Sequence, residues 1–159
     1  MEKVRAEILS TGETYLVGAR IVINAPAKKI FDIVANPYKQ QEIDGSGMLR
    51  GAIKGPEKLV LGSKFAMNMR WKIGYRIANT VVEYKENELI AWSHLLKNRW
   101  RYEFSAIDAN TTQVTQWMDG RMARPRIWLK FNRVLQWGPI AMARTLVRLK
   151  EMAEREELA

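Results

Sequence analysis

The single histidine of the chain, His94, is the first side chain to consider for acid–base chemistry, because the ordinary pKa of imidazole lies near neutrality. Its role depends on the hairpin that follows it. If residues 95–98 form a four-residue loop, His94 pairs with Arg99 on the outer face of the sheet, where Trp92 stacks on Arg101. A loop one residue longer or shorter would turn His94 inward. We adopt the four-residue loop, which predicts no catalytic role for His94.

The same register predicts an inner face on this hairpin, because directly opposite residues of an antiparallel pair share a face. The residues placed there together are Leu89, Ala91, Ser93, Trp100, Tyr102 and Phe104.

Other candidates for chemistry are few. Glu83 and Glu103 are single carboxylates in alternating strand segments, which is typical of surface positions, and no acidic pair has a spacing that demands catalysis. The chain has no cysteine, which excludes disulfides, zinc–thiolate sites and thiol nucleophiles. Nucleophile-elbow, phosphate-loop and metal-ligand motifs are also missing from the sequence. The sequence therefore predicts no catalytic residue, no metal site and no cofactor.

A stripe of methionine and aromatic residues is the strongest candidate for a binding site. The stripe is either plain core or the wall of an apolar cavity, and both interpretations stay open here; flexible, polarisable methionine suits an adaptable wall. The predicted ligand-binding residues are Phe65, Met67, Met69, Trp71, Trp100, Tyr102, Phe104, Gln116 and Met142.

The first elements that position these residues are a strand and two short helices. Residues 13–24 form the predicted strand. Pro26 then occupies a favoured first helical position, and apolar residues follow it at helical spacing through Val34. Asn36-Pro37 ends this helix and caps a second, brief one. We expect Gly45 to end the second helix in a left-handed conformation.

From Met48 to about Arg121 the apolar period changes to two, which is typical of antiparallel strands covered on one side. Turn residues divide this segment into about six strands. The breaks fall at Gly55-Pro56, Gly62, Gly74, Glu86-Asn87, Lys97-Asn98 and Asp108-Ala109-Asn110.

The last segment returns to helical spacing. Met142, Leu146, Leu149 and Ala153 form one apolar stripe, which predicts a long helix from about 139 to 157 with Pro139 in its first turn. Residues 127–137 fit a shorter helix or a loop. We predict one α+β domain over 1–159, in which a curved antiparallel sheet of about seven strands wraps around the long helix and the short helices close one end.

The net charge of +9 is uneven, because residues 120–150 contain eight arginines and lysines and no acid. This basic segment, 121–150, is either a soluble face or an attractor of an anionic ligand, nucleic acid or acidic lipid. No nucleic-acid motif accompanies it, so specific nucleic-acid binding is not expected. No apolar run reaches the length of a transmembrane span and the first residues lack the apolar core of a signal peptide, so a cytoplasmic location is predicted.

Five segments, in this order, resemble the START-like helix-grip (SRPBCC) superfamily, particularly bacterial polyketide cyclase/dehydrase-like proteins. They are "INAPAKKIFDIVANPYKQQEID", "LGSKF", "VVEYKENELIAWSH", "RWRYEFSAIDANTTQVTQW" and "TLVRLKEMAE". The resemblance implies a cavity between the sheet and the C-terminal helix that binds an apolar or polycyclic small molecule or lipid, of the polyketide, sterol, quinone or fatty-acid class. It also implies an alternative, a cyclase or aromatase acting on a polyketide-type chain in the same cavity. In that alternative, Gln116, Asn68 and Tyr102 would donate the hydrogen bonds that stabilise enolates. We favour the carrier, sensor or sequestration function, because the cyclase needs a proton-transfer group that the predicted hairpin keeps outside.

Overall fold

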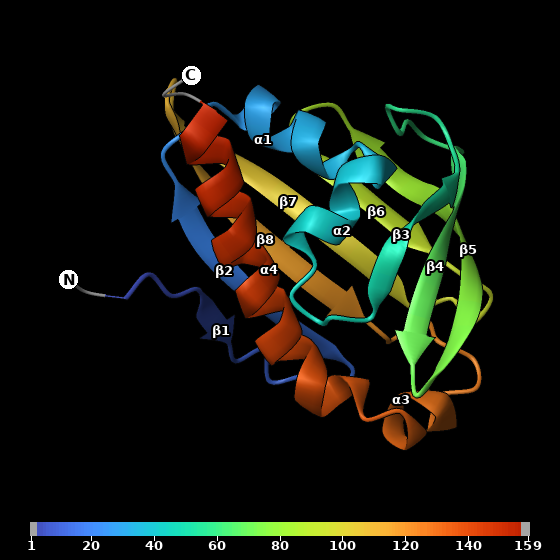
Figure 1. The fold of residues 1–159 in the computed structure, drawn as a ribbon. Coiled ribbons are helices and arrows are strands. Elements are labelled where there is room, and N and C mark those ends of the chain that lie inside the picture. The colour runs from blue at the N-terminus through green and yellow to red at the C-terminus, as the bar shows by residue number, and fades with distance from the viewer. Residues whose placement is uncertain (1–2, 157–159) are drawn as a thin grey trace.

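A computed structural model describes residues 3–156 and shows one open antiparallel sheet with helices on its inner face (Figure 1). Along the sheet the strands follow the order β1-β2-β8-β7-β6-β5-β4-β3. The elements are β1 (Glu7–Leu9), β2 (Leu16–Ile23), α1 (Ala27–Val34), η1 (Pro37–Lys39), α2 (Gln40–Ile43), β3 (Leu49–Lys54), β4 (Lys64–Trp71), β5 (Ile73–Lys85), β6 (Leu89–Ser93), β7 (Arg99–Asp108), β8 (Thr111–Asp119), α3 (Ile127–Phe131) and α4 (Val134–Glu156).

The predicted α+β architecture is confirmed. The sheet has eight strands where about seven were expected, because the short β1 adds to its edge by pairing with β2. The long helix α4 lies across the inner face, mainly against β2 and β8, while α1 and α2 cover the other end (Figure 1).

Helix α4 follows the predicted apolar stripe. Met142, Leu146, Leu149 and Ala153 are all buried against the sheet. The helix begins at Val134 rather than near residue 139, because the Asn132 side chain accepts a hydrogen bond from the Val134 N–H at 3.0 Å. Pro139 therefore lies inside α4. The undecided segment 127–137 contains α3 and the first turn of α4, and predicted helical residue 157 lies outside the described residues.

Two glycine predictions were wrong. Gly45 is not left-handed; it is required by close packing, because a Cβ there would lie 2.4 Å from the backbone oxygen of Ala141 on α4. Gly74 does not form a turn but lies in β5, and the β4–β5 turn is made by Lys72, whose φ is 64°. The cap prediction at Asn36 is confirmed, since its side chain accepts a hydrogen bond from the Tyr38 N–H.

The β6–β7 hairpin also differs from the prediction, because its loop has five residues, 94–98. Residues 94–97 form a tight turn closed by the Lys97 N–H donating to the His94 carbonyl at 2.9 Å, and buried Asn98 adds one more residue. Ser93 consequently pairs with Arg99, and the register shifts by one. The inner face carries Ile90 and Trp92 in place of the predicted Leu89, Ala91 and Ser93.

Candidate functional site

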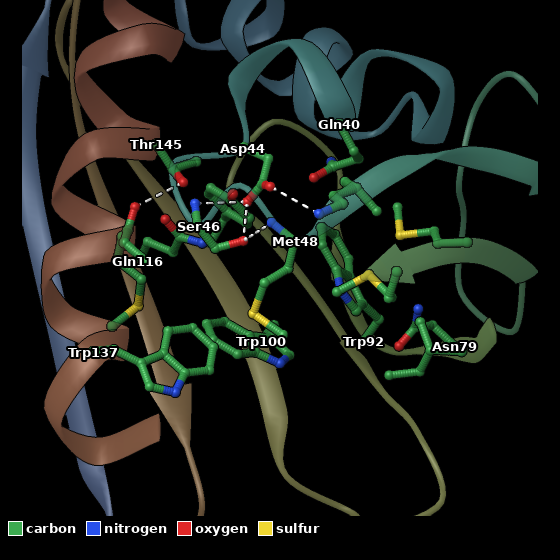
Figure 2. Close-up of a pocket in the computed structure, with 17 residues that line it drawn as sticks. Gln40, Asp44, Ser46, Met48, Asn79, Trp92, Trp100, Gln116, Trp137 and Thr145 are labelled. Carbon is green, nitrogen blue, oxygen red and sulfur yellow. Dashed lines mark hydrogen bonds between the residues drawn. The ribbon is translucent and has the colours of Figure 1, made fainter. Parts of the chain in front are cut away.

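A cavity of about 140 Å³ lies between the inner face of the sheet, helix α4 and the loop that joins α2 to β3 (Figure 2). Most of its wall is apolar, and several polar side chains from different elements project into it. The lining residues are Gln40, Asp44, Ser46, Met48, Leu49, Met67, Met69, Ile77, Asn79, Trp92, Trp100, Tyr102, Gln116, Trp137, Ala141, Met142 and Thr145.

The apolar side of the wall follows from strand alternation. Met67 of β4 lies directly opposite Ile77 of β5, so both side chains point inward. Trp92 of β6 is opposite Trp100 of β7 in the same way. The Trp92 ring packs edge-on against Phe65, with the ring centroids 5.4 Å apart, and this contact holds Trp92 in the cavity wall.

The α2–β3 loop forms a polar part of the wall, and hydrogen bonds within the loop hold its shape. The Asp44 carboxylate accepts hydrogen bonds from the Ser46 N–H at 3.0 Å, the Ser46 hydroxyl at 2.7 Å and the Leu49 N–H at 3.0 Å (Figure 2). The Ser46 hydroxyl in turn accepts from the Met48 N–H. These bonds occupy both carboxylate oxygens, so Asp44 holds the loop in shape.

Helix α4 anchors the same loop. The Gly45 N–H donates to the Thr145 hydroxyl at 2.9 Å, and that hydroxyl donates to the Ala141 carbonyl at 2.9 Å. The Arg148 guanidinium also donates to the Asp44 carbonyl. The loop can approach so closely because Gly45 has no side chain, and the approach places Asp44 and Thr145 side by side at the cavity (Figure 2).

Gln116 of β8 is a polar group of this wall with unused hydrogen-bonding capacity. Its side chain is 6% exposed, and its Oε1 is buried without a hydrogen-bond partner among residues 3–156. Burying an unpaired amide oxygen costs about 1–3 kcal/mol. By contrast, the Gln40 amide at the same cavity donates to the Val34 carbonyl at 2.6 Å.

Tyr102 adds a second polar group, since it lies opposite Gln116 on β7. Within the described part of the chain its hydroxyl has no hydrogen-bond partner, although the residue is buried. Burial raises the pKa of Tyr102, and the negative charge of Asp44 raises that pKa further. The hydroxyl is therefore neutral at ordinary pH, and it faces the cavity as a hydrogen-bonding group.

The structure brings six of the nine predicted ligand-binding residues to the wall: Met67, Met69, Trp100, Tyr102, Gln116 and Met142. Phe65 and Phe104 are buried but pack behind the wall, against Trp92 and Phe31 respectively. Trp71 ends β4 and is 46% exposed, and Asn68 lies on the outer face of the same strand. Ligand contact by any of the nine predicted residues stays a prediction.

Sequence reasoning missed the polar loop and Trp137. Trp137 lies on α4, where its indole N–H donates to the Asn132 carbonyl at 2.7 Å, inside the segment that could not be assigned. Asn79 and Thr145 had a readable signal, because each is a polar residue at an inward position of an otherwise apolar pattern. Asp44 and Ser46 had none, because their positions depend on the loop packing against α4.

His94 lies in the loop rather than on a strand, so the prediction that it pairs with Arg99 was wrong. It is half-buried and outside the cavity wall, and its Nδ1 accepts a hydrogen bond from the Leu96 N–H at 3.3 Å. Burial lowers the pKa of His94.

The outer face carries an ion-pair network where Trp92 had been expected to stack on Arg101. Arg101 bridges Glu83 at 2.8 Å and Asp119 at 3.4 Å, and Arg121 bonds Asp119 at 2.9 Å. The hydrogen bond from Arg121 is the main cause that lowers the pKa of Asp119 to about 2. Burial raises the pKa of Glu83, but the hydrogen bonds from Arg101 and Arg99 outweigh it and lower that pKa overall. Glu103 is exposed.

Within residues 3–156 no group of three or more histidines or carboxylates is arranged to hold a metal ion. No helix in the same range is both long and apolar enough to cross a membrane.

Curated proteins that are similar in sequence to part of the chain come from Mycobacterium tuberculosis. No family model matches the sequence. The uncharacterized protein Rv0088 of Mycobacterium tuberculosis H37Rv is 46% identical over 104 residues, which are 65% of this chain and 46% of that protein. A second protein, MT0096 of Mycobacterium tuberculosis CDC 1551, is 45% identical over the same length. The chain thus spans about half the length of the curated relatives it matches.

Solved structures resemble the whole chain at low sequence identity. Protein Ms6760 of Mycobacterium smegmatis has a TM-score of 0.70 at 14% identity, covering 96% of this chain and 99% of that one. The Polyketide_cyc-like protein Cgl2372 of Corynebacterium glutamicum has 0.60 at 17%, covering 92% and 96%. The Aha1 dimer of Colwellia psychrerythraea has 0.56 at 16%, covering 87% and 96%. The chain has the START-like helix-grip fold that these neighbours share.

Proposed function

We propose that the protein binds a small ligand with an apolar body and one hydrogen-bonding group in the cavity between the sheet and α4. The observation that carries this proposal is the Oε1 of Gln116, which is buried without a hydrogen-bond partner in a wall that is mostly apolar. A ligand hydroxyl or N–H that donates to this oxygen would remove the cost of its burial. The neighbouring Tyr102 hydroxyl supplies a second contact for the same ligand group.

The cavity volume narrows the ligand class. An engineered apolar cavity of about 150 Å³ holds one benzene molecule, whereas sites for drug-sized ligands have about 300–1,000 Å³. At about 140 Å³ this cavity fits one ring or a short branched chain. Among the predicted classes, the ring of a quinone or the first ring of a polyketide fits this volume. A complete sterol would require the wall to move.

The wall favours binding over acid–base catalysis. Its titratable side chains are Asp44 and Tyr102. Both oxygens of Asp44 already accept hydrogen bonds from the loop, and the raised pKa of Tyr102 keeps its proton in place. His94, whose ordinary pKa suits proton transfer at neutral pH, is not part of the wall.

The experiment compares p-cresol with toluene, which differ by a single hydroxyl group, in two-dimensional amide spectra of the full chain. We expect both probes to shift the Trp100 indole and p-cresol alone to shift the Gln116 side-chain amide, with p-cresol binding about tenfold more tightly. Cholesterol and palmitate test the size argument and should leave these signals in place. Shifts confined to Trp117, which points to the outer face next to Gln116, or no shifts at all, would contradict the proposal.

A turnover assay on any bound polyketide-like probe separates binding from catalysis. Unchanged substrate after prolonged incubation is the result expected for a carrier or sensor. Formation of a cyclised product would instead assign the cavity to an enzyme.

A further inference from the structure

Helix α3 exposes large apolar side chains next to the start of α4. Ile127 and Phe131 are each 69% exposed and Trp128 is 48% exposed, while Leu129 between them is buried and anchors the helix. The Trp128 and Phe131 rings pack edge-to-face, with their centroids 5.6 Å apart. Such a cluster on a small protein marks an interaction surface.

The tip of the β4–β5 hairpin exposes a second apolar group. Ile73 is 74% exposed, and it pairs with Trp71 across the turn. Strand β6 pairs with β5 only from Thr80 onward, so residues 73–79 of β5 extend past the end of β6.

The two groups lie at the same end of the molecule (Figure 1). The loop that follows β6, residues 94–98, is at this end, and it joins the segment before α3 because the Arg124 N–H donates to the Leu96 carbonyl at 3.1 Å. We call Trp71, Ile73, Ile127, Trp128 and Phe131 the apolar end.

The charged residues in the sequence segments around the apolar end are all arginines and lysines. Residues 58–82, which contain β4 and the hairpin tip, have no acid, and neither do residues 120–150, which contain α3. Several of the arginines and lysines around it are exposed and form no ion pair with another residue of the described range 3–156. They are Arg70, Lys72, Arg76, Lys97, Arg124, Arg126, Lys130 and Arg133.

We propose that the apolar end docks onto the surface of an anionic phospholipid bilayer. Exposed tryptophan, phenylalanine and isoleucine enter the boundary between headgroups and acyl chains, and the surrounding cations contact the lipid phosphates. Nucleic acid would use the cations but would leave the aliphatic Ile73 and Ile127 in water. A protein partner of neutral charge would leave the cations without anions.

The docking surface is continuous with the cavity. Met67, Met69 and Trp71 occupy successive inward positions of β4, and Ile77, Tyr75 and Ile73 lie opposite them on β5. Met67, Met69 and Ile77 line the cavity, whereas Trp71 and Ile73 belong to the apolar end. On the proposed function, this row of side chains is the path by which an apolar ligand passes between the bilayer and the cavity. Docking itself requires no ligand.

The test is flotation of the full chain with phosphatidylcholine vesicles that contain or lack phosphatidylglycerol. We expect binding to the anionic vesicles only, weakening as salt rises. Trp128→Ala with Phe131→Ala should weaken binding about tenfold, and Arg124→Glu with Lys130→Glu by about tenfold or more. All four positions are exposed, so the variants should fold, which their amide spectra check.

Two control pairs make the same kinds of change, apolar side chain to alanine and cation to glutamate, at exposed positions elsewhere. Val60→Ala with Leu61→Ala removes exposed apolar side chains from the loop before β4, and Lys54→Glu with Lys64→Glu reverses two charges at the end of β3 and the start of β4, away from the hairpin tip. Both control proteins should bind vesicles like the original chain. Equal losses in controls and test variants, no binding of the original chain to anionic vesicles, or binding to duplex DNA in place of vesicles would each overturn the proposal.

The two proposals fail separately. If p-cresol shifts no wall residue but the test variants still lose vesicle binding, docking stands and the cavity proposal is wrong. If p-cresol binds the original chain and the docking variants alike while none of them floats with vesicles, the cavity proposal stands and docking is wrong.

Discussion

Replacing Gln116 by methionine should stabilise the ligand-free protein and weaken ligand binding. Methionine is close to glutamine in length and shape, and it removes the amide oxygen that is buried without a partner. An unsatisfied buried polar group costs about 1–3 kcal/mol, so Gln116→Met should raise the free energy of unfolding by about 1 kcal/mol or more. For a domain of this size that corresponds to an increase in Tm of about 2–4 °C.

Gln40→Met is the matched control, because both glutamines line the same cavity at nearly the same exposure, 5% for Gln40 and 6% for Gln116. The Gln40 amide donates to the Val34 carbonyl at 2.6 Å, so its replacement leaves that carbonyl without this donor. We expect Gln40→Met to lower the free energy of unfolding by about 1–3 kcal/mol. The same substitution thus has opposite effects at two positions a short distance apart.

Urea denaturation of the three proteins without added ligand measures both effects, and p-cresol titration of the same samples measures binding. Gln116→Met should reduce the affinity for p-cresol to that for toluene. If Gln116→Met destabilises the protein as much as Gln40→Met does, the Gln116 amide is satisfied in solution. The reasoning that assigns it to a ligand would then be refuted.

Three further substitutions test the loop, the histidine and the outer ion pairs. Gly45→Ala should lower the free energy of unfolding by about 1–3 kcal/mol in urea denaturation, because the added Cβ overlaps the α4 backbone; a neutral effect would show that the loop can move away. His94→Ala should leave p-cresol affinity unchanged. We expect the original chain to lose stability as pH falls below about 6.5, because burial lowers the pKa of His94 in the folded state and protonation therefore favours the unfolded state; His94→Ala should remove this loss. Loss of turnover in this variant would instead make His94 catalytic. Because Arg121 lowers the pKa of Asp119 to about 2 in the folded state, the original chain should lose stability as pH falls from the ordinary carboxyl pKa to about 2, and Asp119→Asn should abolish this part of the loss. An unchanged dependence of stability on acid pH would exclude the Arg121–Asp119 ion pair in solution.

The helices and the general order of strands could be predicted because their signals are local. The α4 stripe through Met142 and Leu149 has a period of 3.6, and the alternation through Met67 and Met69 has a period of two, so each pattern indicates its own structure and its buried face. Asn36 acts as a cap through an atom two residues away. None of these inferences requires knowledge of a distant contact.

Predictions that depended on distant contacts were wrong or missing. Gly45 was assigned a left-handed conformation from its position after a helix, but the contact that requires glycine is with Ala141 and Thr145, far along the chain. Strand β1 was not predicted, since its three residues are ordered by pairing with β2. The polar wall at Asp44 has the same origin, because the Arg148 and Thr145 side chains of α4 hold that loop in place.

The length of the β6–β7 loop, which was predicted one residue too short, affects the size of the cavity. A four-residue loop after His94 would have placed Ala91 and Ser93 on the inner face, and small side chains there would leave room for a polycyclic ligand. The five-residue loop places Ile90 and Trp92 there instead, and the Trp92 ring fills the space between Phe65 and Tyr102. Because a shift of one residue moves every side chain of a strand to the opposite face, the loop decides whether the Trp92 ring occupies the inner face. If the protein binds a ligand as proposed, the size of that ligand therefore depends on buried Asn98, the extra residue of that loop, as well as on the methionine and aromatic stripe.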